Sequence, residues 1–294
     1  MAARTVPGIL GRAVKADTLD SYLSAIRSVH IDYGMPLDVF QSPWLRRIID
    51  GRRRIEPPKE HKQAIAISPQ VLAEITTTPA AATSIEGLTF DTAAKVAFAG
   101  MLRLGEFTVN KKIKKETFQY TRLTRSDITF SADRTHAILR LKRSKTDTKH
   151  EGVDIVLPAT GTATCPYAAL RELFHRDPKN LTSPLFQMRD GEPITRDWMI
   201  TRLHKRLRTT SNSSKGYSGH SFRRGGAQAA ADNGLLVEDI KAIGRWSSDA
   251  AHRYFQRSIT HKLSLARRFL LRDSSLVFPT ADSWAQFLLH GSHT

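Results

Sequence analysis

The patterns typical of β-strands are confined to one short part of this chain, residues 127–157. Two segments there, 136–142 and 153–157, alternate apolar and polar side chains around the polar turn 144–149, and a shorter strand pattern precedes them at 127–130. Most of the remaining chain follows the three- and four-residue spacing of helices. One small sheet between long helical regions predicts a mainly α fold with a small antiparallel β-sheet.

Helical periodicity and capping residues predict the other elements. The segment 90–101 is apolar on most of its faces, so we expect a buried helix there. Two helices are expected to begin at serine–proline pairs, Ser42-Pro43 and Ser68-Pro69, because proline fits the first helical turn. The full set of expected helices covers 17–33, the segments that follow Ser42 and Ser68, 90–101, 166–175, 195–208, 220–232, 236–243, 248–257, 261–271 and a last one near 281–289.

A polar segment with two adjacent prolines is typical of a linker, and it divides the chain. It predicts a small helical domain over 1–55, a linker over 56–66 and a larger domain over 67–278. The C-terminal segment 279–294 contains an amphipathic pattern with no obvious core of its own. We expect it to pack either on its own chain or on a neighbouring copy.

The chain is strongly basic. It has 45 Lys and Arg residues and 28 Asp and Glu residues, which gives a net charge of +17 and a pI near 10.3. Positive charges in this excess repel one another, and a polyanionic partner relieves the repulsion. Nucleic acid is therefore the first partner to consider, although a ribosomal-type structural protein would share this charge. The single Cys165 excludes an internal disulfide, and no apolar run approaches the roughly 20 residues of a membrane helix. We therefore expect an intracellular protein.

Several common catalytic motifs are missing from the sequence. It contains no Gly-x-x-x-x-Gly-Lys-Ser/Thr loop, no Gly-x-Ser-x-Gly turn and no His-Glu-x-x-His spacing. No tight carboxylate cluster indicates a two-metal nuclease. We therefore expect no metal site and no nucleotide cofactor.

Two clusters of charged residues have unusual local contexts. Arg103 follows the buried helix, and Glu106 lies three residues further on, where its carboxylate can hold the guanidinium; an ordinary surface pair is the alternative. His220 and Arg223 lie at a helix start, where backbone N–H groups favour a phosphate; incidental charges are the alternative. The glycine pair that begins at Gly225 weakens this helix, which indicates a close approach of another backbone.

Two further residues have weaker signals. Lys145 lies at the tip of the predicted hairpin, an exposed position where lysines are common. Tyr254 ends the segment 244–254, and a core aromatic is the alternative. Each signal is weak when it is taken alone.

In their order and spacing, these residues resemble the active site of the tyrosine recombinase (phage integrase) family. The resemblance covers about 17–260 and is carried by Arg103, Lys145, His220, Arg223, Trp246 and Tyr254. The runs 143–146 and 219–221 are similar to the hairpin-lysine and histidine motifs of Cre recombinase. The segment 14–74 looks like the end of the Cre core-binding domain with its linker, and 244–250 resembles recombinases of eukaryotic mobile elements such as Cryptons.

The resemblance implies a helical core-binding domain at 1–55 and a mixed α/β catalytic domain at 67–278. It implies a site-specific DNA recombinase or integrase that cleaves and rejoins double-stranded DNA through a 3′-phosphotyrosyl link, without metal or ATP, in the service of a mobile element. Such enzymes act as homotetramers on synapsed DNA, with a C-terminal helix exchanged between protomers. The protein would be DNA-associated, and nuclear if its source is eukaryotic.

The resemblance also assigns roles to the matching residues. Tyr254 would be the nucleophile and His220 its proton acceptor, and the two arginines would neutralise the phosphate. Lys145 would protonate the leaving 5′ oxygen, Glu106 would orient Arg103 and His220, and Trp246 would pack beside the phosphate or the nucleophile. The DNA contacts expected from position and charge are Arg46, Arg47, Arg52, Arg53, Arg54, Lys142, Arg143, Arg202, Lys205, Arg206 and Arg224.

The chain departs from the family at three places. Only two helices precede residue 55, where the family has about four, and a basic stretch over 110–115 is extra. Family spacing places Arg245, nine residues before the tyrosine, at the His/Trp position, whereas Trp246 has the expected chemistry. We favour Trp246, with Arg245 as the alternative. A type IB topoisomerase-like enzyme and a non-catalytic DNA-binding protein of the same fold are the other readings of the whole chain.

Overall fold

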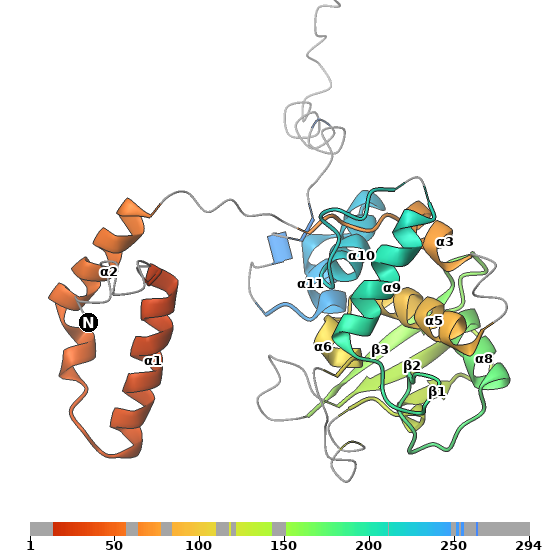
Figure 1. Cartoon of the computed structure of the whole chain (residues 1–294), viewed down its shortest axis with the longest axis horizontal. Helices are drawn as coiled ribbons and strands as arrows, with labels where there is room; N and C mark the ends of the chain where they lie inside the picture. The colour runs from red at the N-terminus through yellow and green to blue at the C-terminus, as the bar shows by residue number, and fades with distance from the viewer. Residues whose placement is uncertain are drawn as a thin grey trace, which may run out of the picture. The chain divides into compact units, whose positions relative to one another are not determined.

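The structure is a computed structural model that divides into two compact units, one ending at Lys62 and the other beginning at Gln63 (Figure 1). No helix among the residues it describes is long and apolar enough to cross a membrane. The described residues are 14–56, 64–77, 84–109, 118, 122–142, 151–210, 212–247, 251–252, 254–255 and 263.

The first unit is a pair of helices. Its elements are α1 (Ala16–Asp32), the 3₁₀-helix η2 (Asp38–Gln41) and α2 (Pro43–Ile55), which has Pro43 in its first turn. Arg53 of α2 pairs with Asp20 of α1, and the Glu56 carboxylate accepts a hydrogen bond from the Ala16 N–H at 2.5 Å. Both helices that the sequence predicts in this region are therefore confirmed.

The first unit buries little apolar surface. Leu19 and Ile49 are buried, whereas Tyr22, Ile26 and Val29 of α1 remain 45–47% exposed. These three residues recur at helical spacing, so one apolar stripe of α1 is left uncovered by the described residues of this unit.

The second unit surrounds a small sheet with helices. Its elements are α3 (Pro69–Thr76), α5 (Ile85–Ala99), α6 (Leu104–Phe107), η3 (Arg125–Asp127), β1 (Ile128–Phe130), β2 (His136–Leu141), β3 (Val153–Pro158), α8 (Pro166–Arg176), α9 (Arg196–Arg208), α10 (Ser221–Asp232) and α11 (Val237–Gly244). Side chains at the N-caps of several helices accept backbone hydrogen bonds: Ser68 for α3, Ser84 for α5, Cys165 for α8 and Thr195 for α9.

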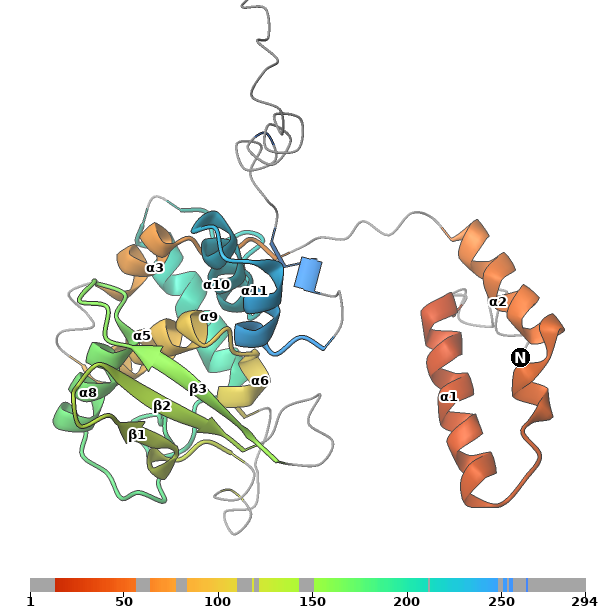
Figure 2. The same ribbon diagram turned by 180° about the vertical axis from the view of Figure 1, so that it is seen from behind.

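The three strands pair in sequence order as an antiparallel sheet, β1-β2-β3. Figure 2 shows this sheet in front of α5 and α8. In β2 and β3 alternate residues point into the core, with Leu139 opposite Ile155 and Ala137 opposite Leu157. The mainly α fold with a small antiparallel sheet is thereby confirmed.

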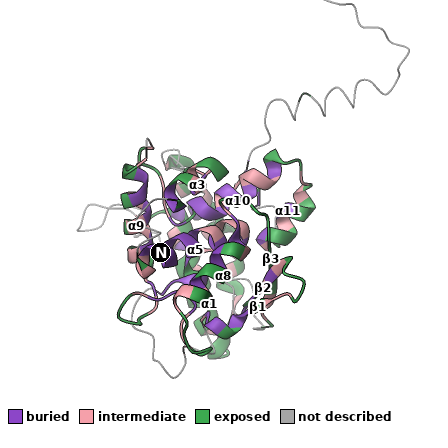
Figure 3. Cartoon of the chain, turned by 90° about the vertical axis from the view of Figure 1, so that its right-hand side faces the viewer, coloured by how far each residue is buried: buried purple, intermediate pink, exposed green. Residues whose placement is uncertain are grey.

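Helix α5 forms the centre of the core (Figure 3). Its buried residues lie on most of its faces, as its apolar sequence predicts. The helix begins five residues earlier than the predicted start at residue 90, because the Ser84 side chain accepts a hydrogen bond from the Gly87 N–H at 3.0 Å. The apolar spacing is too weak over this first turn to reveal the helix.

The glycines of α10 allow this helix to approach α5 closely. A Cβ atom on Gly225 would lie 2.1 Å from the Ile67 carbonyl oxygen, and one on Gly226 would lie 2.3 Å from the Phe98 carbonyl oxygen. The close backbone approach expected from this glycine pair is confirmed. Gly225 lets the second turn of α10 pack on the backbone before α3, and Gly226 lets it pack on the C-terminal end of α5.

Some expected elements lie outside the described residues. These are the helices over 261–271 and near 281–289, and most of the helix over 248–257. In the described part of that last segment, the Tyr254 N–H donates a hydrogen bond to the Ala251 carbonyl at 2.8 Å. This contact forms a turn that ends at Tyr254.

Candidate active site

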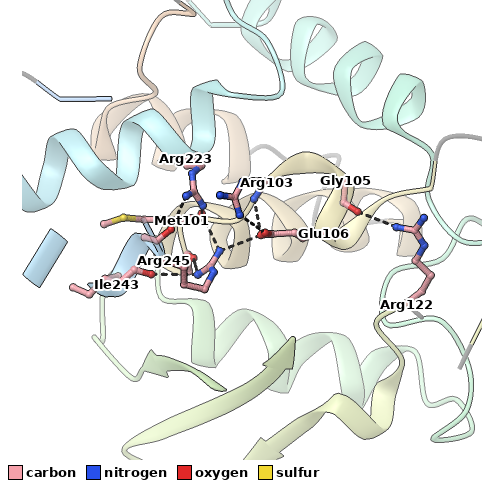
Figure 4. A network of polar contacts seen from close by, with 10 residues as sticks. Met101, Arg103, Gly105, Glu106, Arg122, Arg223, Ile243 and Arg245 are labelled. Carbon is pink, nitrogen blue, oxygen red and sulfur yellow. Dashed lines mark hydrogen bonds and ion pairs between the residues drawn. The ribbon is translucent and has the colours of Figure 1, made fainter. Parts of the chain in front are cut away.

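The turn between α5 and α6 positions a buried carboxylate beside an arginine (Figure 4). Glu106 accepts a hydrogen bond from the Arg103 guanidinium at 2.9 Å and another from the Arg103 backbone N–H at 2.8 Å. The Glu106 side chain is 5% exposed and the Arg103 side chain is 22% exposed. This is therefore a partly buried pair joined by two hydrogen bonds, and the alternative of an ordinary surface pair is excluded.

Arg223, in the first turn of α10, is fully buried. Its two terminal nitrogens donate hydrogen bonds, each 2.5 Å long, to the carbonyls of Met101 and Gly244. Its Nε has no hydrogen-bond partner among the described residues. The guanidinium thus joins the end of α5 to the end of α11.

Trp246 and Tyr254 lie next to this guanidinium. The Arg223 Cζ atom is 4.2 Å from the centroid of the Trp246 ring and 5.6 Å from that of Tyr254. The two rings are themselves 4.9 Å apart and tilted. Both arrangements fall within the range of cation–π and aromatic contacts. The fold therefore brings together Arg223, Trp246 and Tyr254 of one chain.

Arg245 occupies a different place from its neighbour Trp246. Its terminal nitrogens donate to the Glu106 carboxylate at 3.0 Å, to the Gly100 carbonyl at 2.8 Å and to the Met101 carbonyl at 3.2 Å. Its side chain is 9% exposed. Of the two residues that the sequence offered for the His/Trp position, Trp246 faces Arg223 and the tyrosine, whereas Arg245 lies behind Glu106.

His220 is the N-cap residue of α10, and its side chain is exposed. Partial desolvation lowers its pKa, and the positive charges of Arg196, Arg223 and Arg103 lower it further. Among the described residues no hydrogen bond joins His220 to Glu106, contrary to the orienting role expected for that carboxylate. Arg245 is instead the second arginine that Glu106 holds.

Arg196 is a residue that the sequence analysis missed. It is the first residue of α9, it is exposed, and its charge acts on His220. Its backbone N–H donates to the Val109 carbonyl at 3.1 Å, which ties the start of α9 to the segment after α6. No local motif marks this arginine, because only the folded chain brings it to the histidine.

The site is crowded with positive charge. Burial lowers the pKa of Arg223 to about 10, and the charges of Arg103 and Arg245 act in the same direction. Burial likewise lowers the pKa of Arg245, against the opposing effect of Glu106. One carboxylate thus balances part of the charge of three guanidinium groups. Such a site favours an anion.

Several residues expected to contact DNA are used within the second unit instead. Arg206 is 9% exposed, lies 3.5 Å from the Asp91 carboxylate and stacks over Phe90, which argues against DNA contact by this residue. The Lys142 amine lies 2.7 Å from the Asp127 carboxylate. Arg202 is ion-paired with Glu86 and stacks over Trp198.

The other expected DNA contacts differ in exposure and pairing, and one of them lies outside the described residues. Lys205 is exposed and Arg224 is half-buried. In the first unit Arg52 pairs with Glu56 and Arg53 with two aspartates, whereas Arg46, Arg47 and Arg54 are exposed. Lys145 and Arg143 lie outside the described residues.

No group of three or more metal-ligating side chains in the described ranges is arranged to hold a metal ion. The site is instead built from guanidinium, imidazole, phenol and carboxylate groups.

The fold is similar to that of DNA-bound recombinases. It matches the XerH site-specific recombinase bound to difH substrate with a TM-score of 0.51 and 12% identity, over 87% of this chain and 71% of XerH. It matches the Tn1549 transposon integrase in complex with circular intermediate DNA with a TM-score of 0.50 and 15% identity, over 88% of this chain and 80% of that one. No family sequence model and no curated protein sequence matches this chain.

The second unit therefore has the fold of tyrosine recombinase catalytic domains. At these identities the likeness establishes the fold alone.

Proposed function

We propose that this protein is a site-specific DNA recombinase or integrase that breaks and rejoins DNA through a 3′-phosphotyrosyl link to Tyr254. The observation that carries the proposal is the position of the Tyr254 ring, 5.6 Å from the guanidinium of Arg223 in the same chain. In this proposal the phenol of Tyr254, the guanidinium groups of Arg103 and Arg223 and the imidazole of His220 surround one anion site. The recombinase fold of the second unit supports the same function.

In this mechanism the Tyr254 oxygen attacks the phosphorus of the scissile linkage. The bond from phosphorus to the 5′ oxygen breaks, and a 3′-phosphotyrosyl bond forms, so the energy of the phosphodiester is retained for rejoining. His220 accepts the phenol proton, and the lowered pKa of its imidazole keeps it unprotonated at neutral pH. We assign protonation of the leaving 5′ oxygen to Lys145.

Arg103 and Arg223 would neutralise the non-bridging oxygens of the phosphate, since a guanidinium keeps its charge and offers paired donors. The complete burial of Arg223 requires one rearrangement. A phosphate would reach this guanidinium if the rings of Trp246 and Tyr254, which lie against it, moved aside. The buried Nε of Arg223, which has no hydrogen-bond partner among the described residues, would then find a phosphate oxygen.

The proposal extends to the assembly. We propose that 1–55 is a partial core-binding domain, that 67–278 is the catalytic domain, and that four protomers act on two synapsed duplexes, with 279–294 exchanged between neighbours. The exposed Arg46 and Arg54 would contact the DNA backbone, and the net charge of +17 would strengthen the binding. Service to a mobile element, as in Crypton-like elements, and a nuclear location in a eukaryotic host belong to the same proposal.

One observation favours a non-catalytic DNA-binding protein. Arg223 is bonded only to backbone carbonyls, as a purely structural arginine would be. This alternative predicts DNA binding without any covalent product. A type IB topoisomerase-like enzyme would instead form the covalent product and relax supercoiled plasmid without joining two duplexes.

The deciding experiment captures the covalent intermediate. A pool of nicked suicide duplexes with a randomised central region is incubated with the protein, and DNA that survives denaturing washes is amplified and reselected. The proposal expects a selected sequence that forms a protease-sensitive 3′ adduct with the wild type and none with Tyr254→Phe, while both proteins bind the duplex equally. Binding without an adduct in the wild type supports the non-catalytic alternative.

A further inference from the structure

We infer that Arg245 is a positioning residue for DNA cleavage: it fixes the carboxylate of Glu106, and through it the guanidinium of Arg103, against the C-terminal end of α5. The inference rests on the proposed function. It gives the residue at the family's His/Trp spacing a role that does not involve contact with the phosphate.

The contacts form one continuous chain of hydrogen bonds (Figure 4). Arg245 donates to the Oε2 atom of Glu106 at 3.0 Å, and the Oε1 atom of Glu106 accepts from Arg103 at 2.9 Å. The carboxylate therefore lies between the two guanidinium groups. Because the Glu106 side chain is 5% exposed, water offers little competition for either bond.

The same arginine also holds the backbone. Its terminal nitrogens donate to the carbonyls of Gly100 and Met101, which close the C-terminal end of α5. The Met101 carbonyl accepts a second hydrogen bond, from Arg223. Arg245 is thus connected both to the carboxylate that orients Arg103 and to the carbonyl that orients Arg223.

Two strained backbone positions meet at this carbonyl. Met101 has φ +45° and Arg245 has φ +58°, and both are non-glycine residues in the left-handed region. Such conformations cost free energy and persist where the surrounding structure requires them. The left-handed Arg245 ends α11 and is the residue whose guanidinium meets the Met101 carbonyl.

The chemistry of this position requires a fork of donors. Four acceptors, namely one carboxylate and the carbonyls of Gly100, Met101 and Ile243, are served by two terminal nitrogens of one side chain. A lysine would place one point charge there and could not bond all four in the same planar arrangement. Direct contact with a DNA phosphate is disfavoured, because the Arg245 side chain is 9% exposed and its terminal nitrogens are already bonded.

The electrostatic consequence concerns Arg103. Without Arg245, the negative charge of Glu106 would be shared only between Arg103 and the more distant guanidinium of Arg223. Arg103 would be drawn toward the carboxylate and would offer less positive charge to a phosphate. With Arg245 in place, the charge of Glu106 is balanced from behind, and Arg103 can be both held and available.

The test uses Arg245→Ala and Arg245→Lys with the selected suicide duplex. Single-turnover adduct formation is measured at saturating DNA, beside the dissociation constant for the duplex. We expect a loss of about 100-fold in the rate for both variants, as for a displaced catalytic group. The dissociation constant should change little. The control is Arg134→Ala, because Arg134 is also left-handed (φ +60°) but exposed in a turn before β2, and this variant should cleave at the wild-type rate.

Two further measurements separate positioning from a general loss of structure. Millimolar guanidinium should restore cleavage to Arg245→Ala more than sodium chloride of equal ionic strength, and it should not restore Arg223→Ala to the same extent. In a double-mutant cycle, Arg245→Ala should add little to the loss caused by Glu106→Gln, since both act through one carboxylate. Additive losses would indicate direct phosphate contact and overturn the inference.

Failure of the proposed function and failure of the positioning role give different results. If the wild type forms no adduct, the proposed function falls and this inference falls with it. If the wild type forms the adduct and Arg245→Ala forms it equally fast, or is weakened only in DNA affinity, the proposed function stands and the positioning role is overturned.

Discussion

The guanidinium carbon of Arg223 lies 4.2 Å from the centre of the Trp246 ring, and that ring lies 4.9 Å from the ring of Tyr254. The guanidinium carbon also lies 5.6 Å from the centre of the Tyr254 ring, so the guanidinium, the indole and the phenol form a stack of three mutually close groups within one chain. The indole contacts both of the other groups and helps to hold them in place.

Replacement of Trp246 should therefore test whether an aromatic ring is needed at this position. We expect Trp246→Ala to lower the rate of adduct formation at least about tenfold and to destabilise the fold by about 3–5 kcal/mol, because it removes a buried aromatic side chain. Trp246→Phe should keep most of the rate, since a ring remains. Single-turnover cleavage and denaturant unfolding measure the two effects. Equal rates for the two variants would contradict the role of the ring.

The same stack predicts which protomer supplies the nucleophile. Tyr254 and Arg223 are close within one chain, so each active site should be complete in cis. An equimolar mixture of Tyr254→Phe and Arg223→Ala should then form no adduct beyond the sum of the separate proteins. Restored cleavage in the mixture would mean that tyrosine is donated to a neighbouring site.

The histidine predicts the acid limb of the pH profile. His220 accepts a proton only when it is unprotonated, so cleavage should fall as the pH decreases through its pKa. Desolvation and the nearby arginines lower this pKa from its ordinary value of 6.5. We therefore expect the acid limb of kcat/KM to lie below pH 6.5.

Replacement of Arg196 tests the cause of this shift. Arg196→Ala removes one of the positive charges, so the acid limb should move toward higher pH, whereas Arg196→Lys should leave it near its wild-type position. The rate of adduct formation at subsaturating DNA, measured from pH 5 to pH 8, gives the acid limb of each variant. An unchanged limb in Arg196→Ala would rule out its influence on His220.

The contact between α10 and the core predicts a large effect of one methyl group. In Gly225→Ala the new Cβ atom would lie 2.1 Å from the Ile67 carbonyl oxygen, so the backbone must move. We expect a loss of about 1–3 kcal/mol or more in the free energy of unfolding. Gly105→Ala is the matched control, because no atom lies within 4 Å of its added Cβ. Similar stabilities for the two variants would show that the backbone at Ile67 moves aside easily.

A buried carboxyl predicts the pH dependence of stability. Burial raises the pKa of Asp91 from 3.8 to about 7, against the charges of Arg206 and Lys95. The folded state thus favours the protonated carboxyl, so this contribution to stability is complete below about pH 4 and is lost as the pH rises through 7.

Asp91→Asn should remove this loss. Relative to the wild type, we expect its free energy of unfolding to rise between pH 5 and pH 8. In Asp133→Asn the difference from the wild type should stay flat over this range, because hydrogen bonds from Ser131 and Thr135 lower the pKa of Asp133 to about 2. Denaturant unfolding at each pH measures both variants. A flat difference for Asp91→Asn would contradict the raised pKa.

The sequence by itself determined the features that depend on local pattern. Strand alternation located the sheet at 127–157, continuous apolarity marked α5 as buried, and the glycine pair after Arg223 indicated a close backbone approach. These features follow from spacing within one element, which can be read from neighbouring residues. The sequence motif named the residues of the candidate site, but it did not predict the distances between them.

Only the tertiary structure decided which charges meet. Arg245 and Glu106 are 139 residues apart in the chain, and the charge of Arg196, on another helix, lowers the pKa of His220. Arg206, which the sequence favoured as a DNA contact, turned inward to a buried aspartate. A long basic side chain can turn to solvent or to a carboxylate on another element, and the choice depends on what packing places within its reach.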